Sequence, residues 1–290
     1  MTRYTETTVE HSNGDAIWYR RLGEGKPALV LCDGVGCDGY IWKYLIPHFE
    51  KQHTIIHWNY PGHGHTPPPR DLESLDIEEF AEIINLVLDD AGIEEPAVIM
   101  GHSMGVQVIL EFYHRYPERC QALICVTGSC GRALDHVHDT GLVKKLFPYM
   151  QFVVNKAGPL VAEVWRRLVH TELSFQYATN FEINGKLIRR EDFYPYLAHL
   201  SKMDPQVFIR TVQGAARHSA EHTLADIKVP TLIVAGEADR FTPHWISRRM
   251  QTMIPESEIL TLPQGTHTGP LELPELLNLR VEKFLGSLSE

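Results

Sequence analysis

Short apolar runs without polar alternation recur along the chain and predict strands that are buried on both faces. Such runs, rich in β-branched residues, are typical of parallel sheets covered by helices on either side. They lie at residues 28–32, 54–58, 97–100, 122–126, 231–235 and 259–262. A hairpin is predicted before them over residues 4–22, where alternating segments flank Asn13-Gly14, a dipeptide suited to a tight primed turn.

Helical patterns separate these runs. Residues 76–91 place apolar side chains on one stripe and acidic side chains opposite, and Gly92 follows as a stop signal. Residues 104–116 and 271–286 also have a helical pattern. An alternation of strand and helix predicts an α/β fold with a mostly parallel, doubly wound sheet.

The alternation fails between residues 131 and 221. That interval contains no convincing buried strand, but it is rich in aromatic residues and has four helical patterns, at 141–156, 159–173, 190–202 and 205–219. We expect residues 1–130 and 222–290 to form the core domain. Residues 131–221 are then a helical cap, or lid, inserted over the sheet.

Composition narrows the class of partner. The chain has 290 residues and a formal net charge of −10, which disfavours nucleic acid or an anionic membrane as a partner.

Five cysteines without a C-x-x-C pair indicate free thiols in a reducing compartment. The N-terminus lacks an apolar signal segment, and no apolar run approaches the ~20 residues of a membrane span. A cytoplasmic protein without stable membrane insertion is the expectation, and the oligomeric state stays open.

The most specific chemical signal is Gly101-His102-Ser103-Met104-Gly105, which directly follows the run at 97–100. A G-x-S-x-G between a strand and a helix is a nucleophile elbow. Its glycines allow a tight, strained turn that lifts the serine hydroxyl above the sheet edge. Ser103 is therefore the predicted nucleophile, in preference to a simple helix-capping serine.

A serine hydroxyl needs a base within hydrogen-bond reach, and the base needs an orienting group. Ligands of such sheets bind at the carboxyl ends of strands, which limits the search to residues just past strand ends. Asp239 follows the run at 231–235, and His267 follows the run at 259–262. We assign His267 as general base and then acid, and Asp239 as the orienting carboxylate, with Glu237 as the competing acid.

With these residues the chain resembles the α/β-hydrolase superfamily, in particular serine esterases and lipases with a helical cap. Four blocks carry the resemblance, which covers nearly the whole length. They are Asp33-Gly34-Val35-Gly36, Tyr60-Pro61-Gly62-His63-Gly64, the elbow, and the pair formed by 236–239 and 265–267. The resemblance implies the order Ser, Asp, His along the chain, as found here. It also implies ester hydrolysis without a metal or another cofactor.

The resemblance places the oxyanion hole at two backbone N–H groups. One belongs to Met104, after the nucleophile, and the other to Val35, in the loop that follows the first buried strand. Gly34, Val35 and Met104 are therefore the predicted substrate-binding residues. The chain departs from the family at Asp33, where histidine is usual, and at Asn59, where aspartate is frequent. A carboxylate aimed at the oxyanion would oppose it, so Asp33 either turns away to pair with a donor or stays protonated.

A group of histidines and the aromatic residues of the insertion each allow two interpretations. His57, His63 and His65 could suggest a metal site, but without cysteine or carboxylate partners a structural role is favoured. The aromatic residues of the insertion could line an acyl pocket, although most are expected to form the core of the insertion itself.

The leading hypothesis is a serine hydrolase that cleaves a small-molecule carboxylic ester, with an apolar acyl or alcohol group, through an acyl-enzyme. Alternatives on the same triad are a C–C bond hydrolase, an enol-lactonase, a thioesterase and a perhydrolase. Epoxide hydrolases and haloalkane dehalogenases are disfavoured, because those relatives carry aspartate where Ser103 stands. A non-catalytic binder on a hydrolase scaffold is a further alternative, but such relatives usually lose a triad member.

Overall fold

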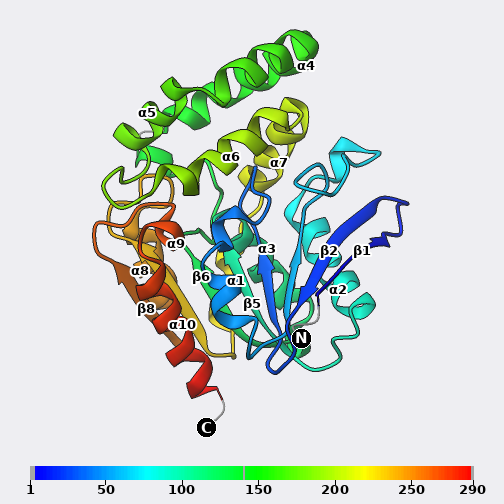
Figure 1. The fold of residues 1–290 in the computed structure, drawn as a ribbon, viewed down its shortest axis with the longest axis vertical. Coiled ribbons are helices and arrows are strands. Elements are labelled where there is room, and N and C mark those ends of the chain that lie inside the picture. Colours follow the sequence, from blue (N-terminus) through cyan, green and yellow to red (C-terminus); the bar gives the residue numbers. More distant parts are fainter. Residues whose placement is uncertain (1–3, 140, 289–290) are drawn as a thin grey trace.

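A single mixed sheet forms the centre of the molecule. The computed structural model describes residues 4–139 and 141–288, and within them eight strands lie in the order β1-β2-β4-β3-β5-β6-β7-β8 (Figure 1). The strands are β1 Tyr4–Glu10, β2 Ala16–Leu22, β3 Leu29–Cys32, β4 Ile55–Trp58, β5 Ala97–His102, β6 Cys120–Val126, β7 Thr231–Gly236 and β8 Ser257–Leu262. The β1–β2 hairpin is antiparallel and joins β4 antiparallel, whereas β3 to β8 pair in parallel. The predicted hairpin, the strands and the α/β fold are confirmed. The run at 259–262 was predicted to be buried on both faces, but β8 lies at the edge of the sheet and is only half-buried.

Helices cover both faces of the sheet because each central strand is apolar on both sides. Val30, Ile99 and Ile233 pack into one core with α2 (Ile77–Asp90), α3 (Met104–Arg115) and α8 (His244–Met253). Their neighbours Leu31 and Val98 pack into a second core on the other face. That core includes α1 (Leu45–Phe49), α9 (Gly269–Glu272) and α10 (Pro274–Ser287). This double burial stabilises the sheet. Because β3 to β8 pair in parallel, their carboxyl ends lie at one edge of the sheet.

Four further helices lie between β6 and β7 in the sequence and over one end of the sheet in space (Figure 1). They are α4 Leu142–Val169, α5 Glu172–Phe181, α6 Arg190–Lys202 and α7 Pro205–Arg217. The bounds of α6 match the prediction, and α7 ends two residues earlier than predicted. None of the helices in the described residues combines the length and the apolar character needed to cross a bilayer.

The first half of this region differs from the sequence prediction. The helices expected at 141–156 and 159–173 form one element, α4, which kinks at Ala157 (φ −123°, ψ 29°) ahead of Gly158-Pro159. Proline removes a backbone donor and clashes with the preceding turn, so the helix bends there without ending. A separate helix, α5, begins after Thr171, whose side chain accepts a hydrogen bond from the Ser174 N–H. Helices α1, α5 and α8 have no counterpart in the sequence prediction.

Candidate active site

Ser103 stands on the strained turn between β5 and α3. Its backbone has φ 56° and ψ −119°, a conformation that L-residues rarely adopt. The glycines of the pentapeptide permit the close packing of this turn. A Cβ on Gly101 would lie 2.3 Å from the Gly105 carbonyl oxygen, and a Cβ on Gly105 would lie 2.4 Å from the Cys32 carbonyl oxygen. The turn therefore holds the serine side chain at the carboxyl edge of the sheet, as the motif predicts.

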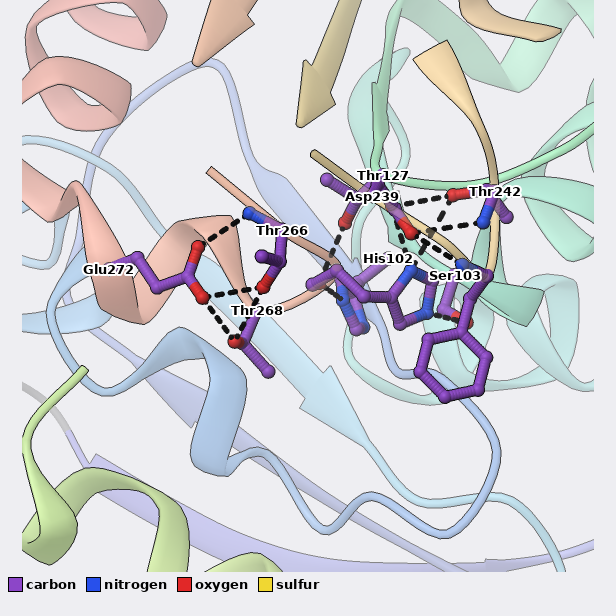
Figure 2. Close-up of polar contacts among 10 residues, drawn as sticks. His102, Ser103, Thr127, Asp239, Thr242, Thr266, Thr268 and Glu272 are labelled. Carbon is purple, nitrogen blue, oxygen red and sulfur yellow. Dashed lines mark hydrogen bonds and ion pairs between the residues drawn. The ribbon is translucent and has the colours of Figure 1, made fainter. Parts of the chain in front are cut away.

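The structure brings together the three residues assigned from the sequence. Nε2 of His267 lies 2.7 Å from Oγ of Ser103, and Nδ1 of His267 lies 2.9 Å from Oδ2 of Asp239. Figure 2 shows Ser103 and Asp239 in this network. Because the carboxylate accepts the Nδ1–H, Nε2 is left to accept the hydroxyl proton of the serine.

Asp239 is buried and its hydrogen-bonding capacity is filled. Oδ1 accepts from the N–H groups of Phe241 (2.8 Å) and Thr242 (3.0 Å), and Oδ2 accepts from the Thr242 hydroxyl at 2.8 Å (Figure 2). These donors stabilise the ionised carboxylate and fix its orientation toward His267. Glu237 instead accepts from the Gln264 N–H at 2.8 Å. The structure thus places Asp239, and not Glu237, against the histidine.

The backbone of His267 is held from two sides. Its carbonyl oxygen accepts from Nε2–H of His102 at 3.0 Å and from the Thr127 hydroxyl at 3.1 Å. His102 is buried, and desolvation lowers its pKa to about 4, which keeps it neutral with the proton on Nε2. His102 therefore fixes the loop that carries His267.

A buried carboxylate that the sequence prediction missed fixes the same loop. Glu272 accepts from the Thr266 N–H at 2.6 Å and from the hydroxyl groups of Thr266 and Thr268, which flank His267 (Figure 2). It also accepts from the Asn184 N–H at 2.9 Å, in the segment between α5 and α6. One side chain thus joins the histidine loop to the region above the sheet. A signal in the sequence that could have revealed Glu272 is its position about one helical turn after the segment Thr266-His267-Thr268.

The residues assigned to an oxyanion hole lie beside Ser103. A Cβ on Gly34 would lie 2.9 Å from Cβ of Ser103, so the loop after β3 passes directly against the serine. Met104 begins α3, whose N-terminal N–H groups carry partial positive charge. The N–H groups of Val35 and Met104 have no hydrogen-bond acceptor within the described residues. Neither N–H group is therefore used by the fold within those residues.

The side chain of Asp33 points away from the oxyanion donors and pairs with hydrogen-bond donors. Of the two possibilities that the sequence left open, pairing with a donor or staying protonated, the structure has the first. Oδ1 of Asp33 accepts from Nε1–H of Trp42 at 2.8 Å, and its Oδ2 lies 3.0 Å from Nε2 of His57, with both side chains fully buried. Nδ1 of His57 accepts from Nε–H of Arg20 at 3.2 Å, so Nε2 carries the proton that Asp33 accepts. The carboxylate is fully engaged and does not face the oxyanion donors.

The remaining histidines of the sequence analysis have structural contacts. His63 is buried and donates from Nδ1 to the Pro61 carbonyl at 3.1 Å, and desolvation lowers its pKa to about 4. His65 donates its backbone N–H to Oδ1 of Asn59 at 3.0 Å, which gives Asn59 a role in the turn at residues 60–66. Within the described residues, no three histidine, cysteine or acidic side chains gather closely enough to hold a metal ion.

Helices α6 and α7 pack closely on the loops beside the serine. Leu200 and Phe208 lie against Gly36, and Val207 lies against Gly62. Tyr196 of α6 stacks on Tyr40 with ring centroids 5.0 Å apart. The surroundings of the oxyanion loop are therefore largely apolar.

Comparisons with known proteins agree with this arrangement. The family model for the alpha/beta hydrolase fold matches residues 27–273. The chain belongs to this family, and a hydrolytic role with a small-molecule substrate follows from that membership.

Individual proteins that the chain resembles share a low sequence identity with it. A protein of Azorhizobium caulinodans named "Putative carbamate hydrolase RutD" is 26% identical over 278 residues, which cover 96% of this chain and 98% of that protein. An esterase from Thermogutta terrifontis has a TM-score of 0.76 at 18% identity and covers 99% of each chain. The enol-lactonase from Burkholderia xenovorans has a TM-score of 0.78 at 16% identity, covering 97% of this chain and all of its own. At these identities the two solved structures support the fold alone.

Proposed function

We propose that this protein is a serine hydrolase that cleaves carboxylic esters through an acyl-enzyme intermediate. The observation that carries the proposal is the continuous hydrogen-bonded chain from Ser103 through His267 to Asp239. Because His267 can accept a proton at Nε2 while Asp239 holds Nδ1–H, the serine hydroxyl is activated without a metal ion.

In the first half-reaction Oγ of Ser103 attacks the carbonyl carbon of the ester, and its proton moves to Nε2 of His267. The carbonyl oxygen becomes an oxyanion that accepts from the N–H groups of Val35 and Met104. The C–O bond to the alcohol then breaks, and His267 returns the proton to the departing alcohol. Such paired donors stabilise charge that develops only in the transition state.

In the second half-reaction a water molecule gives a proton to His267 and attacks the acyl-enzyme. The same oxyanion donors act again, the acid leaves, and Ser103 recovers its proton. Asp239 stabilises the imidazolium that forms in both steps. We further propose that residues 131–221 act as a cap, whose residues Leu200 and Phe208 beside the oxyanion loop favour an apolar acyl or alcohol group.

A second candidate is hydrolysis of a carbamate on the same triad. It rests on the printed name of the 26% identical relative, which aligns over nearly the whole of both chains. A carbamate carbonyl is attacked in the same way and presents the same developing oxyanion, so the triad and its donors do not separate the two substrates.

The test is a panel of p-nitrophenyl acetate, butyrate and octanoate beside a p-nitrophenyl carbamate and an enol-lactone. The proposal predicts ester turnover that Ser103→Ala lowers by on the order of 10³-fold or more. Ser287→Ala, near the end of α10, is the matched control and should keep wild-type turnover. Turnover of the carbamate with none of the esters would favour the second candidate instead.

A further inference from the structure

The outer face of α4 carries an unusual concentration of exposed apolar side chains. Fifteen large apolar side chains are exposed in the described part of the chain, and nine of them lie on this one helix. Tyr149 is 71% exposed and Leu160 is 67% exposed. The nine are Leu142, Leu146, Tyr149, Met150, Phe152, Val153, Leu160, Val164 and Leu168. Isolated exposed apolar residues are normal, but a contiguous group of this size marks an interaction surface.

The spacing of these residues places most of them on one stripe. Leu142, Leu146, Tyr149 and Val153 follow one another at intervals of three or four, and so do Leu160, Val164 and Leu168 after the kink. A different face of α4, which includes Phe147 and Val154, is buried and packs with Ile209 of α7. The helix is therefore apolar on two faces, and only one of them is covered by the rest of the chain.

Basic side chains accompany the stripe. Helix α4 contains three lysines and two arginines but one acidic residue, Glu163, in a protein whose net charge is −10. At 100° per residue, Lys145 and Lys156 lie along one edge of the stripe in the part of α4 before the kink. Arg167 lies after the kink and pairs with Glu163. Lys145 and Lys156 are exposed, and neither is paired with an acidic side chain in the described residues. An apolar face bordered by cations is typical of helices that lie in the headgroup region of anionic bilayers.

The position of α4 suits contact with a flat surface. It is the outermost helix of the molecule in Figure 1, with α6 and α7 between it and the sheet. The exposed apolar group continues onto α5 through Leu173, which is 75% exposed. A helix of 28 residues presents a strip about 40 Å long, and nothing in the described chain stands beyond it.

We propose that α4 is a peripheral docking surface for an anionic lipid bilayer. The apolar stripe enters the headgroup–acyl boundary, and Lys145 and Lys156 lie against the lipid phosphates. A second copy of this chain fits the surface less well, because pairing two such stripes brings their basic edges into a shared interface. The surface lies apart from Ser103 and requires no catalysis.

The experiment is flotation of the full-length protein with vesicles of phosphatidylcholine alone or with 30% phosphatidylglycerol. We expect binding to the anionic vesicles that weakens as salt is raised. Each neutralised surface lysine should weaken the affinity for the anionic vesicles about fivefold. The double variant Lys145→Gln with Lys156→Gln should therefore lower the apparent affinity by about 25-fold. Tyr149→Gln with Leu160→Gln, which keeps good helix formers, should lower it by at least about tenfold.

Matched controls are Lys51→Gln with Lys283→Gln, and Leu279→Gln, all exposed positions away from α4. These variants, and Ser103→Ala, should bind vesicles as the wild type does, which separates this proposal from the proposed hydrolysis. Three results would overturn it: no vesicle binding, equal binding by the α4 and control variants, or a wild-type dimer in solution that Tyr149→Gln with Leu160→Gln converts to monomer.

Discussion

The carboxylate of Asp33 and the imidazole of His57 form a fully buried pair, with Oδ2 and Nε2 3.0 Å apart. The pairing of β3 with β4 sets Leu31 opposite His57, which brings the end of β3 and its carboxylate to the ring. Arg20 of β2 completes the chain through Nδ1 of the histidine. Asp33 therefore anchors the base of the loop that carries Val35 to two neighbouring strands.

Replacement of this carboxylate should destabilise the protein. In Asp33→Asn the amide group can still accept from Trp42, but its NH₂ then faces Nε2–H of His57. The other tautomer of His57 would place a proton against Nε–H of Arg20. We expect a loss of about 1–3 kcal/mol in the free energy of unfolding, measured by urea denaturation.

Asp38→Asn, a partly exposed position in the same loop, is the control and should change the free energy of unfolding by less than about 0.5 kcal/mol. Asp33→His, which restores the usual residue of the family, should also destabilise, because it presents a ring to Trp42 and His57. A fully stable Asp33→Asn protein would refute this account of the buried pair.

Glu272 should affect turnover through the position of His267. In Glu272→Gln the amide NH₂ opposes one of the donors from Thr266, Thr268 or Asn184, and the histidine loop shifts. Small displacements of catalytic groups are costly, so we expect kcat to fall between roughly 10- and 100-fold with KM little changed.

The control for this variant is Glu275→Gln, an exposed residue of the first turn of α10. It should leave kcat and KM unchanged. If Glu272→Gln raised KM alone, Glu272 would be acting on substrate binding through Asn184 and not on the position of His267.

Two buried histidines should make stability depend on pH. Desolvation lowers the pKa of His63 and of His102 from 6.5 to about 4 in the folded protein. As the pH falls below 6.5 the unfolded chain takes up protons that the folded protein does not bind until about pH 4. The contribution of these two histidines to the free energy of unfolding should therefore be complete above pH 6.5. Between pH 6.5 and 4 the free energy of unfolding should fall by about 1.4 kcal/mol per pH unit for each histidine.

Urea unfolding between pH 7 and pH 4.5 measures this slope. His63→Asn retains a donor toward the Pro61 carbonyl but cannot be protonated, so it should lower the slope by about 1.4 kcal/mol per pH unit. His170→Gln, on an exposed residue, is the control. An unchanged slope in His63→Asn would contradict the assigned neutral state of His63.

The sequence predicted most of the sheet and the grouping of the site, because both depend on local signals. Buried strands appear as apolar runs, and Ser103, Asp239 and His267 each lie a few residues past the end of one. The kink in α4 at Ala157 and the start of α5 were mispredicted, since an amphipathic pattern does not show where a proline bends a helix and where it ends one. The partners of Asp33 and Glu272 depend on strand register and on contacts between distant segments, which residue types alone do not reveal.

The most direct test of the central proposal is the site of covalent modification by a fluorophosphonate probe, located by intact mass and peptide mapping. We predict a single adduct on Ser103 in the wild type, and a loss of labelling in His267→Gln, where Nε2 can no longer accept the serine proton. Persistent ester turnover by the wild type with no adduct on Ser103, or an adduct on another residue, would contradict the account.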